Sequence, residues 1–231
     1  MKDLFSVTGK TVLVTGAGGS IGSELCRQVA AVGPSSLVIV DHAENNLFEI
    51  DLELRERGHA PTPVVADCRD ADLMEHVFTA HRPEIVFHAA AYKHVPMMES
   101  QPSEALKNNV LGTEVVARLA AELAAEKFVL ISSDKAVNPT NVMGASKRLA
   151  EIHLQAVYAE QFKTASIPVY SHEAVQGSGA TNAKVDASTE RSRSGNRAEA
   201  AGPYLLNSTA SPFKRNPTKI MAVRFGNVLG S

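Results

Sequence analysis

Cysteine and long apolar runs are both scarce in this chain. Only two cysteines occur in 231 residues, Cys26 and Cys68, and their spacing forms neither a metal-ligand pattern nor a disulfide framework. No segment reaches the roughly 20 apolar residues that a membrane span requires, and the start, MKDLFSVTGK, lacks an apolar run of signal-peptide length. We therefore expect a soluble protein of the reducing cytoplasm, with no membrane segment in this chain.

An excess of charge of either sign is also missing. The formal net charge is −2, and without a basic field nucleic-acid binding has no electrostatic support. Hydrophobic residues make up 44% of the chain, enough for a core in one large domain or two small ones.

A glycine-rich turn, TVLVTGAGGSIG, is the most informative stretch. The apolar residues before it predict a buried strand, and a helix is expected to begin near Ser20. A phosphate needs backbone N–H donors at close range and the positive end of a helix, and glycine removes the side chains that would obstruct it. The expected phosphate-binding residues are Gly16, Gly19, Ser20, Ile21 and Gly22.

An acidic residue at the end of the next strand supports this interpretation. The segment SLVIVD ends at Asp41, at about the distance that a dinucleotide-binding unit requires. Its carboxylate would accept hydrogen bonds from the adenosine ribose and repel the 2′-phosphate of NADP, so we expect NAD. Asp67, after the following strand, is a candidate for binding adenine. The alternative, that Asp67 is a solvent-exposed aspartate with no ligand, is nearly as well supported.

Strands and helices alternate along the first two thirds of the chain. This pattern predicts an α/β fold with a Rossmann-like, doubly wound parallel sheet. Strands are expected at 12–15, 36–41, 63–66, 84–88, 128–132 and 220–225, and helices at 21–32, 44–57, 73–80, 103–126 and 139–162.

The alternation stops after about residue 162. From 163 to 218 the chain is rich in Ser, Ala, Thr, Asn and Gly, which is typical of a flexible insertion. We therefore expect an NAD-binding domain over 1–162, a low-complexity insertion over 163–218, and a last strand over 219–231. A C-terminal substrate lobe is expected to be missing, as in a fragment.

Several residues beyond the fourth strand are candidates for ligand contact. Ala89 and Ala90 would let the backbone approach a cofactor, and Lys93 and His94 carry cations into the loop that follows. Asn109 is either a hydrogen-bonded core amide or an amide that orders the active site. No metal is expected, because no cluster of ligands accompanies the histidines.

Five segments together resemble a known family. In order they are the glycine turn, HAAAYKHV, NNVLGT, SSDKAVNPTNVMGASK and VRFGNVLGS. The chain resembles the extended short-chain dehydrogenase/reductases, and within them the UDP-N-acetylglucosamine 4,6-dehydratases of bacterial polysaccharide biosynthesis. The likeness covers residues 10–161 and resumes at 220. Larger members of that family carry N-terminal membrane helices.

The resemblance implies a lyase that uses NAD and a UDP-sugar. Lys135 would remove the C5 proton of a 4-keto sugar, Asp134 would protonate the departing C6 hydroxyl, and Ser133 would hydrogen-bond the C4 oxygen. Lys147 would bind the nicotinamide ribose, and Met143 stands where the superfamily usually has tyrosine. Each proton transfer would supply roughly 10²–10⁴-fold. The substrate site is expected to include Lys93, His94, Asn109 and Asn227, and the protein is expected to pair with itself through its two long helices.

Asp134 and Lys135 have two interpretations. Their spacing alone favours a surface ion pair, whereas the motif SSDKAVNPTNVMGASK around them favours a catalytic role. Because Lys135 must be partly neutral to act as a base, we expect it to be desolvated. The chain could instead be a nucleotide-sugar 4-epimerase, which needs no acid and base at these positions, or a non-catalytic NAD-binding fragment.

Overall fold

A single parallel sheet organises the part of the chain that the structure describes. The computed structural model describes residues 6–164 and 217–225. Six strands pair in the order β3-β2-β1-β4-β5-β6, and every pairing is parallel. This is the strand order of the doubly wound dinucleotide-binding fold, so the predicted fold class is confirmed.

The strands and most helices lie close to their predicted positions. The strands are β1 (Thr11–Thr15), β2 (Ser36–Asp41), β3 (Thr62–Val65), β4 (Ile85–His88), β5 (Lys127–Ser133) and β6 (Lys219–Phe225). The helices are α1 (Ser20–Val32), α2 (Glu44–Glu56), α3 (Ala71–His81), α4 (Val95–Ser100), α5 (Pro102–Leu106), α6 (Gly112–Glu122) and α7 (Val142–Thr164).

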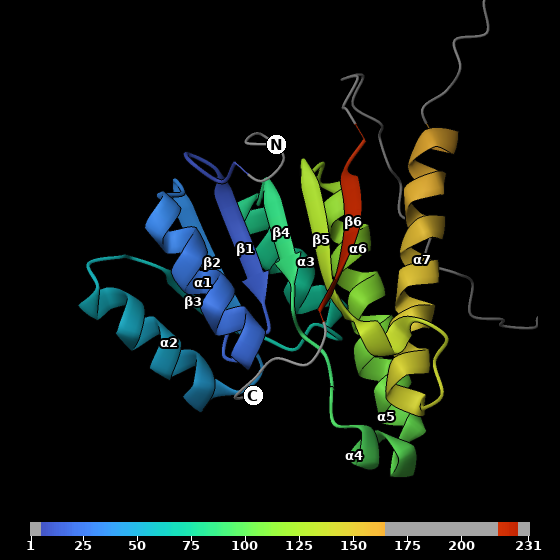
Figure 1. Cartoon of the computed structure of the whole chain (residues 1–231). Coiled ribbons are helices and arrows are strands. Elements are labelled where there is room, and N and C mark those ends of the chain that lie inside the picture. Colours follow the sequence, from blue (N-terminus) through green and yellow to red (C-terminus); the bar gives the residue numbers. More distant parts are fainter. Residues whose placement is uncertain (1–5, 165–216, 226–231) are drawn as a thin grey trace, which may run out of the picture. The chain divides into compact units, whose positions relative to one another are not determined.

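Helices cover both faces of the sheet (Figure 1). Val12 and Val14 point to the face that packs against α1 and α2, whereas Leu13, between them, packs with α3, α6 and α7. Because successive strand residues point to opposite faces and both are covered, a buried parallel strand is apolar throughout. That is why the strands can be read from short apolar runs.

The predicted long helix over 103–126 is observed as a continuous helical segment over 102–122 that contains a π turn and ends four residues earlier than predicted. Residues 107–111 form a π-helical turn between α5 and α6. Such a turn widens the helix and frees a backbone carbonyl from the regular pattern. Asn109 lies in this π turn and is buried. The segment 95–100, predicted to be loop, is the short helix α4.

The last described helix begins three residues later than the predicted start at Pro139. The side-chain oxygen of Asn141 accepts a hydrogen bond from the Gly144 N–H at 2.7 Å, which is the usual N-cap interaction. The predicted insertion over 163–218 falls almost entirely outside the described residues, and the predicted domain boundaries remain predictions.

Candidate active site

The glycine turn lies at the point where the strand order reverses, between β1 and β4. Gly16 has a φ of +68°, and a Cβ there would lie 2.6 Å from the Ala90 nitrogen. A Cβ on Gly22 would lie 1.8 Å from the Gly16 carbonyl oxygen. Any side chain at either position would force the turn away from β4 or from α1, so both glycines are required by close backbone approach. Ligands bind at this crevice in open α/β sheets.

The N-terminus of α1 is suited to an anion. Its N-cap residue, Gly19, offers no side-chain oxygen to the first turn, and that turn carries no acidic residue. The Lys93 ammonium donates a hydrogen bond to the Ser20 hydroxyl at 3.3 Å. A helix end with uncapped N–H groups and a lysine beside it favours phosphate. Lys93, predicted for the substrate site, thus lies beside the predicted phosphate-binding turn.

Asp41 organises the same turn from the end of β2. Its two carboxylate oxygens accept hydrogen bonds from the backbone N–H groups of Gly18 and Ala43, each at 2.9 Å. The residue is 7% exposed. A carboxylate oxygen accepts more than one hydrogen bond, so the ribose contact predicted for Asp41 is compatible with this geometry and stays a prediction.

Asp67 is held by an arginine two residues away. The Arg69 side chain donates to both of its carboxylate oxygens, at 2.6 to 3.0 Å. This interaction is the main reason that the pKa of Asp67 lies below its usual range. The arrangement orients the carboxylate at the end of β3, and the predicted adenine contact remains a prediction.

Asn109 is a buried connector between three segments. Its amide oxygen accepts from the Tyr92 N–H at 2.8 Å, and its amide nitrogen donates to the Tyr92 carbonyl at 3.1 Å and to the Ser146 hydroxyl at 2.9 Å. It therefore joins the loop that carries Lys93 to the turn of α7 that carries Lys147. A direct substrate contact, as predicted for Asn109, would require some of these bonds to break. His94 is exposed at the start of α4.

His88, a buried histidine at the end of β4, is linked to Asn109 through Thr113. The Thr113 hydroxyl donates to the Asn109 carbonyl at 2.7 Å, so His88 Nε2, 3.0 Å away, must donate to Thr113. His88 Nδ1 then accepts from the Thr15 hydroxyl at 2.7 Å. Burial, aided by the charge of Lys147, lowers the pKa of His88 to about 3. His88 is thus neutral, with its proton on Nε2.

The residues predicted to do acid–base chemistry follow β5. Asp134 and Lys135 stand on one turn of 3-10 helix, with 3.7 Å between the Lys135 Nζ and a carboxylate oxygen of Asp134. The Ser133 hydroxyl donates to Asp134 at 3.0 Å, and this hydrogen bond, helped by the Lys135 charge, keeps the pKa of Asp134 below its ordinary value.

The expected desolvation of Lys135 is wrong for this structure. The Lys135 side chain is 38% exposed and the Asp134 side chain 57% exposed, because the turn that carries them projects beyond the end of the sheet. The buried lysine at this end is Lys147, which is 6% exposed. Its Nζ donates to the Ile131 carbonyl at 2.7 Å, and burial lowers its pKa to about 8.

Met143 occupies an apolar position one turn before Lys147. It is 3% exposed and packs with Met98 and Ala105. Its thioether carries no proton to transfer, so the position contributes packing and leaves proton transfer to its neighbours. Asn227, the remaining predicted substrate residue, lies outside the described residues.

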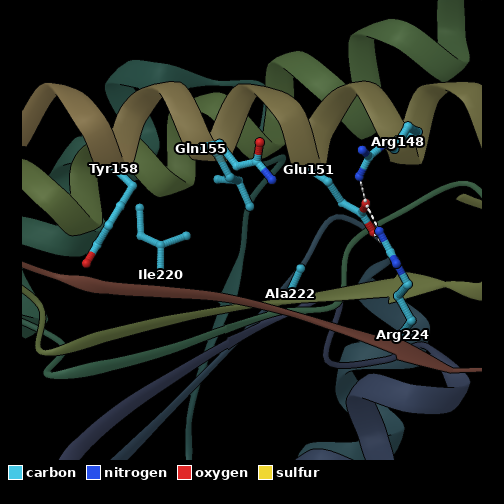
Figure 2. Close-up of a pocket in the computed structure, with 8 residues that line it drawn as sticks. Arg148, Glu151, Gln155, Tyr158, Ile220, Ala222 and Arg224 are labelled. Carbon is cyan, nitrogen blue, oxygen red and sulfur yellow. Dashed lines mark hydrogen bonds and ion pairs between the residues drawn. The ribbon is translucent and has the colours of Figure 1, made fainter. Parts of the chain in front are cut away.

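A second polar cluster was missed by the sequence analysis. Glu151 on α7, 4% exposed, is bound by Arg148 of the same helix and by Arg224 of β6 (Figure 2). Glu151 lines an open pocket of about 510 Å³ between α7 and β6. The signal available in the sequence was its spacing, because Glu151 lies four residues after Lys147 and therefore one turn along the same helix face.

Two kinds of structural feature are absent from the described residues. Over 6–164 and 217–225, no three histidine, cysteine or acidic side chains gather where they could hold a metal ion. Within the same ranges, no helix combines the length and the apolar character that crossing a membrane requires.

Comparisons with known proteins agree with this geometry. Residues 12–177 match the model of a family described as "Polysaccharide biosynthesis protein". The capsular polysaccharide biosynthesis protein CapD of Staphylococcus aureus is 48% identical over 166 residues, which are 71% of this chain and 28% of that relative. The chain therefore spans little more than a quarter of the length of this relative.

Solved structures share the fold. Pen from Bacillus thuringiensis superposes with a TM-score of 0.64 at 30% identity, covering 69% of this chain and 48% of that one. The UDP-glucose 4-epimerase of Bifidobacterium longum, solved in complex with NAD+ and UDP, gives a TM-score of 0.59 at 25% identity and covers 65% of this chain and 49% of the epimerase. The chain belongs to the polysaccharide biosynthesis protein family and shares its fold with an epimerase solved with NAD+ and UDP.

Proposed function

We propose that this chain binds NAD at the carboxyl end of its sheet and dehydrates a UDP-sugar, UDP-N-acetylglucosamine, across C5 and C6 to give a 4-keto-6-deoxy sugar. The observation that carries the proposal is the position of Asp134 and Lys135 directly after β5, on a turn packed against the start of α7, which holds Lys147. An acid and a base on one rigid support can reach a single sugar ring.

The residues around the glycine turn fit NAD. The first turn of α1 and Lys93 would bind the diphosphate, and Asp41 would bind the adenosine ribose. Lys147 would bind the nicotinamide ribose. When bound, NAD supplies the reversible hydride acceptor that the oxidation at C4 and the later reduction at C6 require. The buried Lys147 would also lower the pKa of sugar or ribose hydroxyls near it.

Asp134 and Lys135 would carry out the elimination. Lys135 Nζ would take the proton from C5, the electron pair of that C–H bond would form the C5–C6 double bond, and the C6 hydroxyl would leave as water with a proton from Asp134. Asp134 is a carboxylate in the free site, because Ser133 and Lys135 lower its pKa. A bound sugar that displaces the Ser133 hydroxyl and excludes water would raise that pKa and allow the carboxyl to hold a proton.

A second function, nucleotide-sugar 4-epimerisation, is favoured by a specific observation. The structural likeness to a UDP-glucose 4-epimerase covers most of the described residues, and epimerisation uses the same cofactor turn. It requires a hydride transfer and a proton transfer at C4 but no elimination at C6. Asp134 and Lys135 would then have no chemical role.

Mass spectrometry separates these functions. The chain is incubated with NAD and UDP-N-acetylglucosamine, and we expect a product lighter by one water. A product of unchanged mass, whose inverted C4 is identified by its proton NMR coupling constants, would establish the epimerase. Stabilisation by NAD without any product would leave only an NAD-binding module.

A matched control accompanies this assay. Lys107 is an exposed lysine paired with Glu104 at 2.9 Å, so Lys107→Met removes the same charge as Lys135→Met from a surface position. Loss of water elimination in Lys135→Met, with normal elimination in Lys107→Met, would assign the effect to the site.

A further inference from the structure

Four donors converge on the buried carboxylate of Glu151. Its Oε1 accepts from the Ser132 hydroxyl at 2.8 Å and from Arg224 Nε at 2.8 Å. Its Oε2 accepts from Arg224 Nη2 at 2.6 Å and from Arg148 Nη1 at 2.9 Å. Figure 2 shows Glu151 and Arg148 extending from α7 toward Arg224 on β6. We name Glu151, Arg148, Arg224 and Ser132 the carboxylate clamp.

The clamp surrounds a charge that would otherwise be costly to bury. Burial, the largest single effect, would raise the pKa of Glu151, but the hydrogen bonds from Arg224, Ser132 and Arg148 together outweigh it and hold the pKa at about 2. Glu151 is therefore an anion throughout the physiological pH range. It stays charged because β6 places Arg224 opposite Ser132 of β5.

Lys147 is the nearest buried cation along the same helix. It lies one turn before Glu151, and the side chains of both residues are almost fully buried. Residues four apart on a helix are neighbours on its surface, and the Glu151 charge acts on the Lys147 ammonium in the opposite direction to burial. The clamp and the proposed nicotinamide-binding lysine are thus parts of one electrostatic unit.

We propose that Glu151 is a positioning residue that acts on Lys147 through its charge, and that Arg224 limits this action by pairing with the Glu151 carboxylate. Through Arg224, the last described strand of the sheet is coupled to the charge of the active-site lysine. The proposal rests on the proposed function only in the role that it gives to Lys147. The coupling itself follows from the contacts of the clamp.

Among the ionisable groups near this part of α7, Glu151 is the buried negative charge. His88 is neutral. Asp134 and Lys135 form an exposed pair whose charges oppose each other, and solvent screens exposed charges more strongly than buried ones.

Four acids lie on helices packed against α7, namely Glu99 on α4, Glu104 on α5, and Glu114 and Glu122 on α6, and none of them is buried. The Glu99 carboxylate accepts from the Val142 N–H at the start of α7 at 2.7 Å. The other charged groups on packed elements include Lys107 on the π turn, Asp134 and Lys135 after β5, and Arg224 on β6, and His88 on β4 is close enough to interact electrostatically with Lys147.

Two substitutions in the clamp should move the pKa of Lys147 in opposite directions. Glu151→Gln removes the negative charge but keeps the size of the side chain, so Lys147 should lose its proton about one pH unit lower. Arg224→Met removes a competing positive charge, so Lys147 should hold its proton to higher pH by a similar amount. A purely structural role would not produce shifts of opposite sign.

The measurement is a pH titration of the chain labelled with ¹³C-lysine and followed by NMR. Lys147→Met identifies the Lys147 signal by its loss. Arg118→Met is the matched control, because Arg118 is an exposed arginine paired with Glu122 on α6, and it should leave the Lys147 midpoint unchanged. If Glu151→Gln does not fold, as circular dichroism would show, the upward shift in Arg224→Met decides the question alone.

Shifts of the same sign, no shift, or an ordinary lysine midpoint in the unsubstituted chain would overturn the proposal. A separate calorimetric titration with NAD tests the proposed function. Absence of NAD binding together with opposite Lys147 shifts would refute the cofactor site and leave the coupling intact. NAD binding without those shifts would do the reverse.

Discussion

Two lysines at the carboxyl end of β5 differ in almost every physical respect. Lys135 stands on an exposed turn beside Asp134, whereas Lys147 is buried in α7 and bonded to the backbone of β5. Burial has lowered the pKa of Lys147 before any ligand arrives. The Lys135 side chain is 38% exposed. The same end of the sheet therefore holds one buried lysine and one that remains in contact with solvent.

Glu151 and Asp134 show the same contrast between a buried and an exposed charge. The Glu151 side chain is 3% exposed and receives four hydrogen bonds, whereas Asp134 is 57% exposed. A buried, fully bonded carboxylate can hold its charge but cannot exchange protons with a substrate. An exposed one can exchange protons because its contacts are easily displaced. In the mechanism that we propose, proton transfer belongs to the exposed pair, Asp134 and Lys135, and charge control to the buried pair, Glu151 and Lys147.

The largest expected effect concerns the exposed pair. Lys135→Met or Asp134→Asn should reduce water elimination by roughly 10²–10⁴-fold, because each substitution removes one proton-transfer group. Neither should change the melting temperature noticeably, since exposed ion pairs contribute only about 0–1 kcal/mol. Steady-state rates and thermal melts measure the two quantities.

The comparison would break down if either variant kept full activity. It would also break down if either lost stability in proportion to its activity, because a folding defect would then account for the loss. The Lys107→Met variant supplies the reference value for removal of a surface lysine.

A smaller effect concerns acid stability and the buried His88. Its pKa is about 6.5 in an unfolded chain and about 3 when folded, so between these values the unfolded state holds a proton that the folded state lacks. The free energy of unfolding should therefore fall as pH falls below 6.5, by up to about 1.4 kcal/mol per pH unit. Above pH 6.5 this contribution vanishes. Urea denaturation between pH 4.5 and 7 measures the slope.

His88→Gln tests the assignment. The glutamine amide offers one acceptor and one donor, as neutral imidazole does, but it does not titrate. The slope between pH 4.5 and 6.5 should flatten, although absolute stability should fall by about 1–3 kcal/mol through lost packing and hydrogen bonds. An unchanged slope would mean that another group takes up the proton. Below pH 4.5, protonation of Glu151 in the unfolded state adds a separate loss.

The smallest effect sharpens the contrast between buried and exposed charge. Arg118→Met breaks the Arg118–Glu122 pair, whose side chains are 44% and 54% exposed. We expect a change of about 0–1 kcal/mol in the free energy of unfolding, within the scatter of careful denaturation curves. A loss above 2 kcal/mol would show that surface pairs in this chain contribute as much as the carboxylate clamp.

Local patterns predicted most of the sheet. The predicted range of β2, Ser36–Asp41, is the observed one, and the glycine turn lies where the strand order reverses. These features follow from short apolar runs and from glycines, which act on residues close in sequence. The π turn at Lys107–Leu111 was not predicted, because helical periodicity does not reveal that the Thr113 hydroxyl binds His88 and that the Asn109 amide binds Ser146.

The sequence by itself determined the class of fold, the order of its strands and helices, and the place where a dinucleotide would bind. Only the tertiary structure decided which lysine is buried and what faces it. Arg224 and Glu151 are 73 residues apart in the chain and meet because β6 pairs with β5 beside α7. Burial and long-range ion pairing arise when distant elements pack together, and no local pattern encodes them.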